Sequence, residues 1–599
     1  MTEPHKPLEQ MTAQERLALG RSYYNKGKFD EAITLLQTIV PTEDSLTHTE
    51  AQLGLGFAYE FKGNINEAIS AWLNIHREDN PKAYAWAQFR LGFAYEIQDR
   101  LDECISAWSN IDRKDNPEVY AKAQLNLGAT YYAQGKLDQA IEAWSNIHRE
   151  DDSEAYTRAQ FNLGTAYANQ NNLDNAITAW SKITRDDDPE TYAGAQLCLG
   201  EVYSLDKEKE EQAHEAYDNV RDFSYYKSER GFKILRCTLG IRKDLHSLVE
   251  NTDKVLKSLQ IIPDFESKVS HYSRAATAFT LFGDERNDQN PSNFRLSTIR
   301  GVNDPTEGLV LGKYWDQQGI PEIIHTNDTA TFISCFTFNH DSLNQFRLYG
   351  KEGGREATGV SLVFKKEFFS DQTDTLEFIA GPSTDLSSKS IQIKPNETGK
   401  PESDNKKPLI GKSTLYRCIY LDPETGYWTL AQRDKSTFYR ENKEKETAEN
   451  HWIEYSKKIS KIEESFKDSL FNNNDSILEK LKSIFKDPNT YGVEEKQKIL
   501  EAIRFILLPL QYLVKHIAFQ EEQECRIMYI TQFRDEKIHS DREKQWMYVE
   551  YEEPVLPHID KIWLSPGAAK DQDFFRILLD QGSGKSKVRI SQNPFRNKE

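Results

Sequence analysis

The sequence predicts a multidomain protein in which an all-α superhelix is followed by an α+β domain with a helical insertion. Two observations lead to this fold class. In the first third of the chain, residue types recur every 36 positions, as in Trp72, Trp108, Trp144 and Trp180. From about His271 onward this period is absent, and aromatic and β-branched runs alternate with turn residues. Because a single globular core does not need such a period, stacked copies of one supersecondary unit explain the first part best.

Each copy has the features of a helix pair. Asn80 is a good N-cap residue, and Pro81 follows at the first helical position, where its missing N–H group would have no intrahelical partner. The first helix carries apolar residues at helical spacing and ends near Asp99, where other copies have Gly or Asn. A shorter second helix should run over residues 101–111, and its small residue Cys104 should let the two helices approach closely.

The repeated positions also indicate a family. In one copy they are Leu91, Gly92, Tyr95, Cys104, Trp108 and Ile111. This pattern resembles the tetratricopeptide repeat, whose usual period is about 34 residues. The two extra residues of each copy lie in acidic connectors between helix pairs, and the glycine-rich turn of the similarly long Sel1-like repeat is missing. The resemblance covers residues 12–205 and implies a superhelix with an extended groove for a protein partner.

The first helices of the copies should line the concave groove, and the residues expected to project into it are mostly aromatic. They are Phe57, Glu60, Phe61, Trp86, Phe89, Phe93, Leu125, Tyr132 and Phe161. Tetratricopeptide domains that bind the terminal carboxylate of a partner place Lys and Asn where this sequence has Leu53, Phe57, Phe89 and Phe93, so no such clamp is expected. An apolar groove suits a hydrophobic peptide segment, another subunit or the protein's own C-terminal domain. At least half of the aromatic residues could instead be core between repeats.

Charge and cysteine usage restrict the class of protein. The chain has 76 Lys and Arg against 95 Asp and Glu residues, a net charge of −19, which argues against a dominant nucleic-acid-binding surface. None of the six cysteines forms a CxxC pair, which indicates reduced thiols and a cytoplasmic protein. The N-terminus has no apolar signal-peptide core, and the most apolar stretch, residues 505–514, is too short to cross a membrane.

These patterns predict the organisation of the chain. We expect a polar lead-in at residues 1–11, an array with polar-faced capping helices at 12–260, and an α+β domain at 263–599. Within that domain, residues 371–412 should form a mobile insertion and residues 442–519 a helical insertion. Helices are expected at 233–241, 245–259, 442–470, 476–485 and 493–519. Strands are expected at 332–338, 359–364, 415–421, 526–530, 546–551 and 559–564.

Several short stretches of the second half follow one another in an order that resembles a protein family. They lie at residues 271–273, 296–297, 303–308, 333–337, 344–349, 359–362, 521–526 and 559–566. The family is an uncharacterised bacterial one, domain-of-unknown-function family 2971, and the resemblance covers about residues 269–596. The family usually has Trp near Phe346, and its name implies no activity. The resemblance implies a bacterial protein with an effector domain and a possible part in stress or antiphage defence.

The order of polar residues in this half suggests one enzymatic hypothesis. ADP-ribosyltransferases act on NAD with a His at the start of one strand, a Ser or Thr on another and a Glu that leads into a later strand. By this analogy His271 would hydrogen-bond the adenosine-side ribose, and Ser334 or Thr337 would orient NAD. Glu524, or Glu522, would stabilise the positive charge that develops on the nicotinamide ribose. NAD is the cofactor expected if the domain is such an enzyme.

Two other interpretations stay open. His271 could lie at the edge of the core while Glu524 pairs with Arg526 or with a helix end, which would leave a binding module without turnover. Alternatively, the stretch at 303–307 could join Glu522 and Glu524 in a Mg²⁺ site for phosphodiester cleavage, although a turn explains that stretch more simply. The histidines show no HExxH spacing typical of zinc enzymes. We therefore expect partner docking by the array and an effector domain of undetermined activity.

Overall fold

A computed structural model describes most of the chain. The described residues are 10–283, 290–299, 308–321, 329–349, 358–370, 408–442, 444–472, 476–486, 491–541, 543, 545–579 and 587–593. Nearly all of the predicted insertion at 371–412 lies outside them, as does the stretch at 303–307. None of the described helices combines the length and the hydrophobicity that a membrane span requires.

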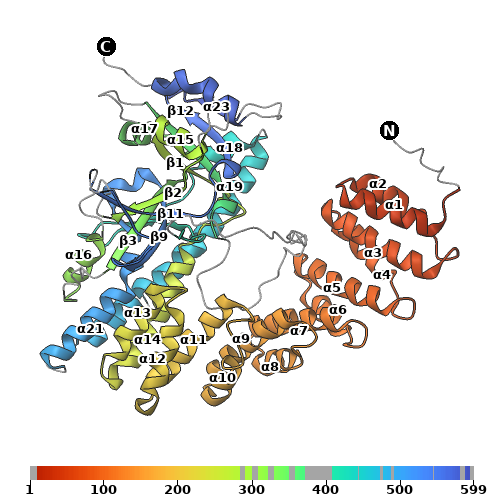
Figure 1. Cartoon of the computed structure of the whole chain (residues 1–599), viewed down its shortest axis with the longest axis horizontal. Helices are drawn as coiled ribbons and strands as arrows, with labels where there is room; N and C mark the ends of the chain where they lie inside the picture. The colour runs from red at the N-terminus through yellow and green to blue at the C-terminus, as the bar shows by residue number, and fades with distance from the viewer. Residues whose placement is uncertain are drawn as a thin grey trace, which may run out of the picture. The chain divides into compact units, whose positions relative to one another are not determined.

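The described residues divide into two compact units, of which the first ends at Leu199 and the second begins at Gly200. The first unit is an array of helix pairs, drawn in red to orange in Figure 1. Its helices are α1 (Ala13–Asn25), α2 (Phe29–Leu36), α3 (Ser45–Phe61), α4 (Ile65–Leu73), α5 (Pro81–Ile97), α6 (Leu101–Ser109), α7 (Pro117–Ala133), α8 (Leu137–Ser145), α9 (Ser153–Asn169) and α10 (Leu173–Trp180), and α11 (Pro189–Ser204) spans the division. The predicted all-α repeat fold is confirmed.

The ends of the repeat helices lie where the sequence predicts them. At the start of α5 the Asn80 side chain accepts a hydrogen bond from the backbone N–H of Ala83 at 3.1 Å, and Pro81 occupies the first turn. The helix ends before Asp99, which has a left-handed backbone with φ of 58°. Gly135 has the same conformation at the equivalent position of the next copy, with φ of 73°.

The repeated Gly and Trp residues form one packing unit. The Trp108 indole lies directly over Gly92, where an added Cβ atom would come within 2.0 Å of Nε1. The same Nε1 atom donates a hydrogen bond to the Phe89 carbonyl oxygen at 3.1 Å. The indole needs the space above Gly92 as well as the Phe89 carbonyl oxygen as acceptor. The Gly and Trp residues therefore recur together and hold the two helices of each pair in contact.

The acidic connectors join neighbouring copies by ion pairs. In each pair an Arg of one connector contacts an Asp of the next connector, and the Asp side chain is at most 8% exposed. The pairs are Arg77–Asp115, Arg113–Asp151 and Arg149–Asp187. The residues that lengthen the repeat beyond its usual period therefore lie in segments that tie adjacent copies together.

The second unit contains a large sheet, and its pairings are antiparallel except between β12 and β13. Its strands are β1 (Lys268–Arg274), β2 (Phe294–Thr298), β3 (Thr329–Thr337), β4 (Gly359–Lys365), β5 (Tyr416–Arg417), β9 (Glu524–Gln532), β10 (His539–Asp541), β11 (Trp546–Tyr551), β12 (Ile559–Leu564) and β13 (Val588–Ile590). The order is β10-β11-β2-β3-β1-β4-β12-β13, and β9 pairs with β3 and β5. A smaller sheet has the order β7-β6-β8, with β6 (Ile419–Leu421), β7 (Trp428–Leu430) and β8 (Val514–His516).

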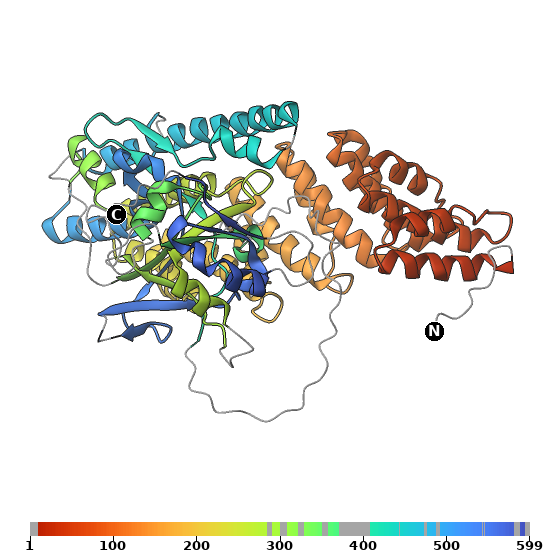
Figure 2. The same cartoon turned by 90° about the horizontal axis from the view of Figure 1, so that it is seen from above.

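Helices accompany both sheets, so the predicted α+β class with a helical insertion is confirmed. They are α12 (Glu210–Val220), α13 (Tyr225–Leu235), α14 (Leu239–Ser258), α15 (Ala275–Phe282), α16 (Val310–Gln317), α17 (Leu343–Tyr349), α18 (Lys435–Glu441), α19 (Lys445–Lys467), α20 (Ile477–Ile484), α21 (Val493–Ile506), α22 (Leu508–Leu513) and α23 (Gln572–Leu579). Figure 2 shows α19, in cyan, as a long helix at one edge of the unit.

The helices expected to cap the array belong to the second unit. Tyr226 of α13 stacks on Phe505 of α21 at 5.4 Å and donates a hydrogen bond to the Ile506 carbonyl oxygen at 2.7 Å. The buried face of α14 joins the apolar core of the second unit rather than presenting polar residues. The break between α13 and α14 lies before Leu239 rather than after Ile241, because Thr238 takes the N-cap position with an extended backbone.

Two predicted elements of the second half differ from the structure. The helix expected at 493–519 is divided at Leu507 into α21 and α22 and ends at Leu513, and the chain then forms β8, which pairs in parallel with β6. The strand expected at 415–421 is split, because the chain changes sheets at Cys418, whose N–H donates to the Glu524 carbonyl oxygen at 2.9 Å. Both differences arise from pairing between segments that are far apart in the sequence.

Candidate functional site

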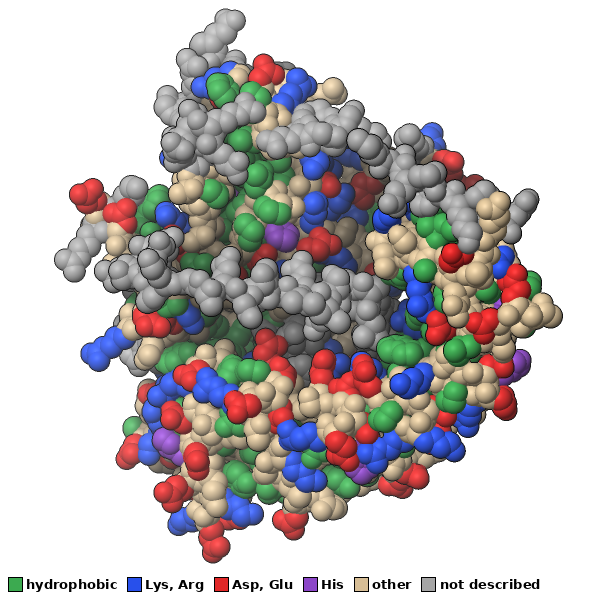
Figure 3. All heavy atoms as spheres, turned by 45° about the vertical axis from the view of Figure 1, so that its right-hand side comes forward, with side chains coloured by type: hydrophobic (Ala, Val, Ile, Leu, Met, Phe, Trp, Pro, Cys, Tyr) green, Lys and Arg blue, Asp and Glu red, His purple; other side chains and the backbone are tan. Residues whose placement is uncertain are grey.

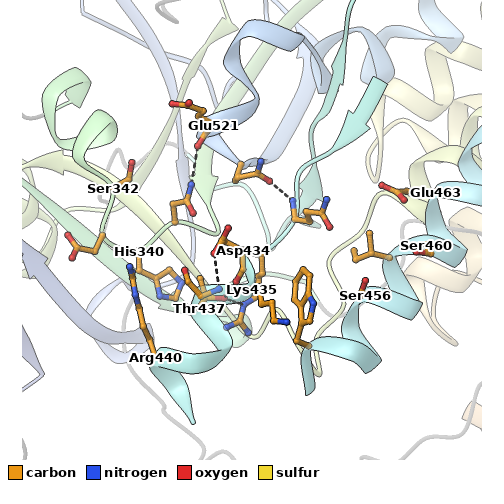
Figure 4. A pocket seen from close by; sticks show the side chains of 18 residues that line it. His340, Ser342, Asp434, Lys435, Thr437, Arg440, Ser456, Ser460, Glu463 and Glu521 are labelled. Atoms are coloured by element: carbon orange, nitrogen blue, oxygen red, sulfur yellow. Dashed lines mark hydrogen bonds between the residues drawn. The ribbon is translucent and has the colours of Figure 1, made fainter. Parts of the chain in front are cut away.

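A polar pocket of about 760 Å³ lies in the second unit where β3 ends and β9 begins. Four segments far apart in the sequence line it, and they lie within residues 339–342, 432–440, 452–463 and 521–523. Figure 4 shows Ser460 and Glu463 on one side of the pocket and His340 and Arg440 on the other. Its volume is in the range of small-molecule sites.

Hydrogen bonds between the lining segments fix the shape of the pocket. The Asn339 side-chain amide donates to the Glu521 carbonyl oxygen at 3.0 Å. The Gln432 N–H donates to the Gln523 side-chain oxygen at 2.7 Å, and Gln523 has a left-handed backbone with φ of 47°. These two contacts join the ends of β3 and β9 to the segment before α18.

His340 lines the pocket as a neutral ring. Its Nε2 atom donates to the Lys268 carbonyl oxygen at 3.1 Å, and Ser361 Oγ donates to the His340 carbonyl oxygen at 2.7 Å. Burial, together with the nearby cations Lys561 and Arg433, lowers the pKa of His340 to about 3. With its proton on Nε2, the ring offers Nδ1 as a hydrogen-bond acceptor.

The aromatic wall of the pocket is formed by α18 and α19. Trp452 packs edge-on against Phe438, with ring centroids 5.7 Å apart, and lies 5.9 Å from the ring of Tyr455. The Tyr455 hydroxyl donates to the buried carboxylate of Glu266 at 2.7 Å. The Arg433 guanidinium lies 4.1 Å from the Phe438 ring centroid and closes this cluster. The indole of Trp452 is thus held firmly while part of it stays exposed.

A buried ionic cluster lies beside the pocket at the start of β9. Glu524 Oε2 contacts Lys515 Nζ at 2.6 Å, and Glu524 Oε1 contacts Arg526 Nε at 2.5 Å. Lys515 also contacts Glu522 at 2.5 Å. Burial alone would raise the pKa of Glu524, but Arg526 and Lys515 outweigh it and hold that pKa well below its usual range. Both carboxylate oxygens of Glu524 are therefore engaged within the protein.

The predicted catalytic residues lie on two faces of the sheet. Residues opposite each other in an antiparallel pair share a face, and neighbours along a strand alternate. Thr337 lies opposite Glu524 in the β3–β9 pair and opposite Ser270 in the β1–β3 pair. His271 and Ser334 therefore point to the other face. The structure brings Thr337 and Glu524 together but separates them from His271 and Ser334.

His271 is held in the aromatic core of its face. Its ring lies 5.1 Å from the Phe294 ring and 5.6 Å from the Phe336 ring, and Nδ1 donates to the Cys335 carbonyl oxygen at 2.9 Å. Burial lowers the pKa of His271. Thr337 is likewise engaged, because its hydroxyl donates to the Glu522 carbonyl oxygen at 2.6 Å. These contacts tie β1 to β3 and the end of β3 to the residues before β9.

The predicted groove residues of the array differ in exposure. Phe89, Phe93 and Phe161 are at most 4% exposed, so the prediction that they line an open groove is wrong. They pack between helices instead, as Leu125 does. Phe61 is 47% exposed, whereas the remaining groove residues are partly buried: Phe57, Glu60, Trp86 and Tyr132. Figure 3 shows basic and acidic side chains interspersed over the face in view, so charge marks no single docking surface there.

The sequence analysis did not identify the residues that line the pocket. Ser456, Ser460 and Glu463 lie three or four positions apart on α19, which is the spacing of one helix face, and Trp452 lies one turn before them. The sequence feature that could have indicated them is a polar helix face that carries one aromatic residue. Glu521 belongs to the stretch 521–526 that carries the family resemblance, but Glu522 and Glu524 were the carboxylates predicted there as functional.

The fold and the site define a helical-repeat protein joined to an α+β domain that contains a polar pocket. A tetratricopeptide-repeat family model matches residues 17–84 and 125–191. A model described as protein of unknown function (DUF2971) matches residues 345–527, which contain three of the four pocket segments. The chain thus carries tetratricopeptide repeats in its N-terminal part and a C-terminal DUF2971 domain. No curated protein matches the chain significantly.

Several solved structures are similar to part of the chain. The crystal structure of MamA is 28% identical and covers 27% of this chain and 91% of its own, with a TM-score of 0.23. YrrB, described as a tetratricopeptide-repeat protein with an unusual peptide-binding site, is 18% identical and covers 30% and 87%, with a TM-score of 0.23. A thermophilic tetratricopeptide-repeat protein from Thermus thermophilus is 22% identical and covers 30% and 92%, with a TM-score of 0.21.

Proposed function

We propose that the protein docks a protein partner through its array and binds a small polar molecule in the pocket of its DUF2971 part. The observation that carries the proposal is a set of polar groups that line one cavity without partners. Among the described residues, neither Arg440 nor Glu463 forms a hydrogen bond or an ion pair. Arg440 is exposed and Glu463 is partly buried, so both side chains are available to a ligand with complementary groups.

Exposed apolar residues at the repeat spacing support docking by the array. Phe61 and Ile97 lie 36 positions apart at the ends of α3 and α5 and are 47% and 59% exposed. Leu101 at the start of α6 is 37% exposed. The Phe61 ring stacks on Phe29 at 5.3 Å, which fixes its orientation. Apolar side chains that are held in place on a surface suit a partner with an apolar segment.

Affinity capture with the full chain tests the docking role. We expect Phe61→Ser with Ile97→Ser to reduce capture of the partner about tenfold or more, because two exposed apolar anchors are lost. Leu73→Ser is the matched control, since Leu73 is 53% exposed at the end of α4 but does not share the position of Phe61 and Ile97 in the repeat. Equal loss in the control, or capture unchanged in the double variant, would contradict this docking surface.

The NAD-dependent transferase stays a prediction. It needs a carboxylate that is free to face NAD, and Glu524 is engaged by Lys515 and Arg526. The carboxylate that lines the pocket in the same stretch is Glu521. NAD turnover by the full chain, measured for the wild type, His271→Ala and Glu521→Gln, tests the transferase. Turnover that neither substitution lowers would exclude both residues from such a site.

A further inference from the structure

The acidic side chains of the pocket are not held in ion pairs. Four of them line it, namely Asp341, Asp434, Glu463 and Glu521, and none forms an ion pair among the described residues. Asp341 accepts from the Asn593 amide at 2.9 Å, Asp434 from the Ser436 N–H at 2.8 Å, and Glu521 from the Asn344 amide at 3.0 Å. The hydrogen-bond partners of these three carboxylates are thus neutral donors, while Arg440 acts on Asp434 and Arg417 on Glu463 without forming an ion pair.

The basic side chains of the pocket are mostly neutralised from outside it. Arg433 contacts Glu441 at 2.7 Å, and Lys435 contacts Glu449 at 2.8 Å. Neither of these glutamates lines the pocket. Only Arg440 stays without an ion pair within the part of the chain that the structure describes. The pocket therefore has an excess of negative charge, although it is lined by almost as many cations as carboxylates.

Other lining groups suit the same kind of ligand. Ser456, Ser460 and His340 line the pocket, and their hydroxyl groups and the His340 Nδ1 atom are hydrogen-bond acceptors without a partner among the described residues. The partly exposed indole of Trp452 offers a face to a cation. A metal ion is a poor occupant, because no group of three or more His, Cys, Asp or Glu residues in the described ranges could hold one.

We propose that the pocket binds an organic cation, namely a linear polyamine. The proposal rests on the pocket being the functional site of the second unit, and it names the class of ligand. Glu463 lies at one side of the pocket, whereas Asp434 and Glu521 lie away from it (Figure 4). A chain with several ammonium groups can contact carboxylates on different sides of the pocket. The indole of Trp452 then covers the methylene segments or an ammonium group between them.

Calorimetric titration of the full chain with spermidine tests the proposal. Because the protein carries a net charge of −19, the titration is done at physiological salt, where weak surface binding of cations is screened. We expect saturable binding of one molecule per chain. Glu463→Gln should weaken it about tenfold, as expected for one lost charge-assisted hydrogen bond, and Trp452→Leu should weaken it about threefold or more.

Glu464→Gln is the matched control, because Glu464 is the exposed neighbour of Glu463 and does not line the pocket. It changes the net charge equally and should leave the affinity unchanged. Equal weakening by both glutamine variants would overturn the proposal, since it would show non-specific attraction.

Parallel titrations with NAD, ATP and inorganic phosphate test whether the pocket binds a ligand of another class. Binding of one of these anions but not spermidine, weakened by Arg440→Ala, would overturn the polyamine while supporting the pocket, and no binding of any probe would overturn both.

Discussion

Glu524 and Glu463 are acidic residues within one region of the second unit, but their surroundings assign them different roles. Glu524 has both oxygens bound by Lys515 and Arg526 and is almost fully buried. Glu463 has no such partner, and burial raises its pKa. Removing Glu524 would take the carboxylate away from buried Arg526 and leave Lys515 with Glu522 alone, which is strongly destabilising. Loss of function in a Glu524 variant would therefore report on folding, whereas Glu463→Gln can be interpreted as a change in the pocket.

Glu201 on α11 provides a test of pH dependence. Burial raises the pKa of Glu201 to about 7, and the nearby carboxylates of Asp253 and Glu250 offset part of the opposing effect of Arg230. The folded state therefore holds the proton more tightly than the unfolded chain. This contribution to stability is fully present below the ordinary value of 4.5 and is lost as pH rises through about 7. We expect Glu201→Gln to match the wild type at pH 5 and to be more stable at pH 8.

The size of this effect is at most about 3 kcal/mol, given about 1.4 kcal/mol for each unit of pKa. Thermal unfolding of both proteins between pH 5 and 8 measures it. Burial also lowers the pKa of His246 to about 3, which gives both proteins a pH dependence of the opposite sign. The difference in stability between wild type and Glu201→Gln removes this shared contribution. A constant difference over this range would contradict the assignment.

Gly92 provides a test of the packing inside one repeat. A Cβ atom at this position would lie within 2.0 Å of the Trp108 indole, so Gly92→Ala must displace the ring and should destabilise the array by about 1–3 kcal/mol. Gly54→Ala is the control, because its Cβ would meet only the Leu36 Cδ1 atom, at 3.2 Å. Thermal unfolding of the full chain measures both. An effect of Gly92→Ala no larger than that of Gly54→Ala would show that the Gly–Trp contact does not limit stability.

At the scale of elements, the connector ion pairs should set the coupling between repeats. Arg113 contacts Asp151 at 2.7 Å, and the Asp151 side chain is only 4% exposed. We expect Arg113→Ala to destabilise the array by about 1–3 kcal/mol, because it leaves a buried carboxylate unpaired. Arg100→Ala removes the exposed pair with Glu103 and should change stability by less than about 1 kcal/mol. Similar effects of the two substitutions on the unfolding midpoint would contradict a coupling role for the connectors.

The elements of the array were predictable from the sequence because their signals are local. The N-cap at Asn80, the left-handed position at Asp99 and the space for Trp108 over Gly92 each depend on residues of one repeat. The exposure of the groove residues was not predictable, because Phe89 and Phe93 are covered by neighbouring helices. Helical spacing places a side chain on a face but does not say which neighbour packs against it.

The elements around the pocket were less predictable, because their positions depend on long-range pairing. The change of sheets at Cys418 and the strand β8 arise from partners about a hundred residues away. The order of His271, Thr337 and Glu524 suggested one site, but the strand registers place His271 on the opposite face. Only the registers bring Asn339 and Glu521 together beside Gln432.

At the scale of the whole molecule, the two units carry separable roles. The proposal assigns the partner surface to the array and the ligand pocket to the second unit. The two roles predict that Phe61→Ser with Ile97→Ser leaves spermidine binding unchanged, and that Glu463→Gln leaves partner capture unchanged. Calorimetry and affinity capture of the same protein samples check both statements. Loss of both functions in either variant would contradict this division.

Hydrogen exchange of the full chain with and without spermidine tests the central claim most directly, because it locates the ligand without assuming a site. We predict slower exchange in α18 and α19 and at residues 521–523, which line the pocket, and no change in α1–α10. The same slowing should be absent in Glu463→Gln at a ligand concentration that half-saturates the wild type. Slower exchange confined to the array, or none in α19, would contradict the proposal that the pocket is the functional site of the second unit.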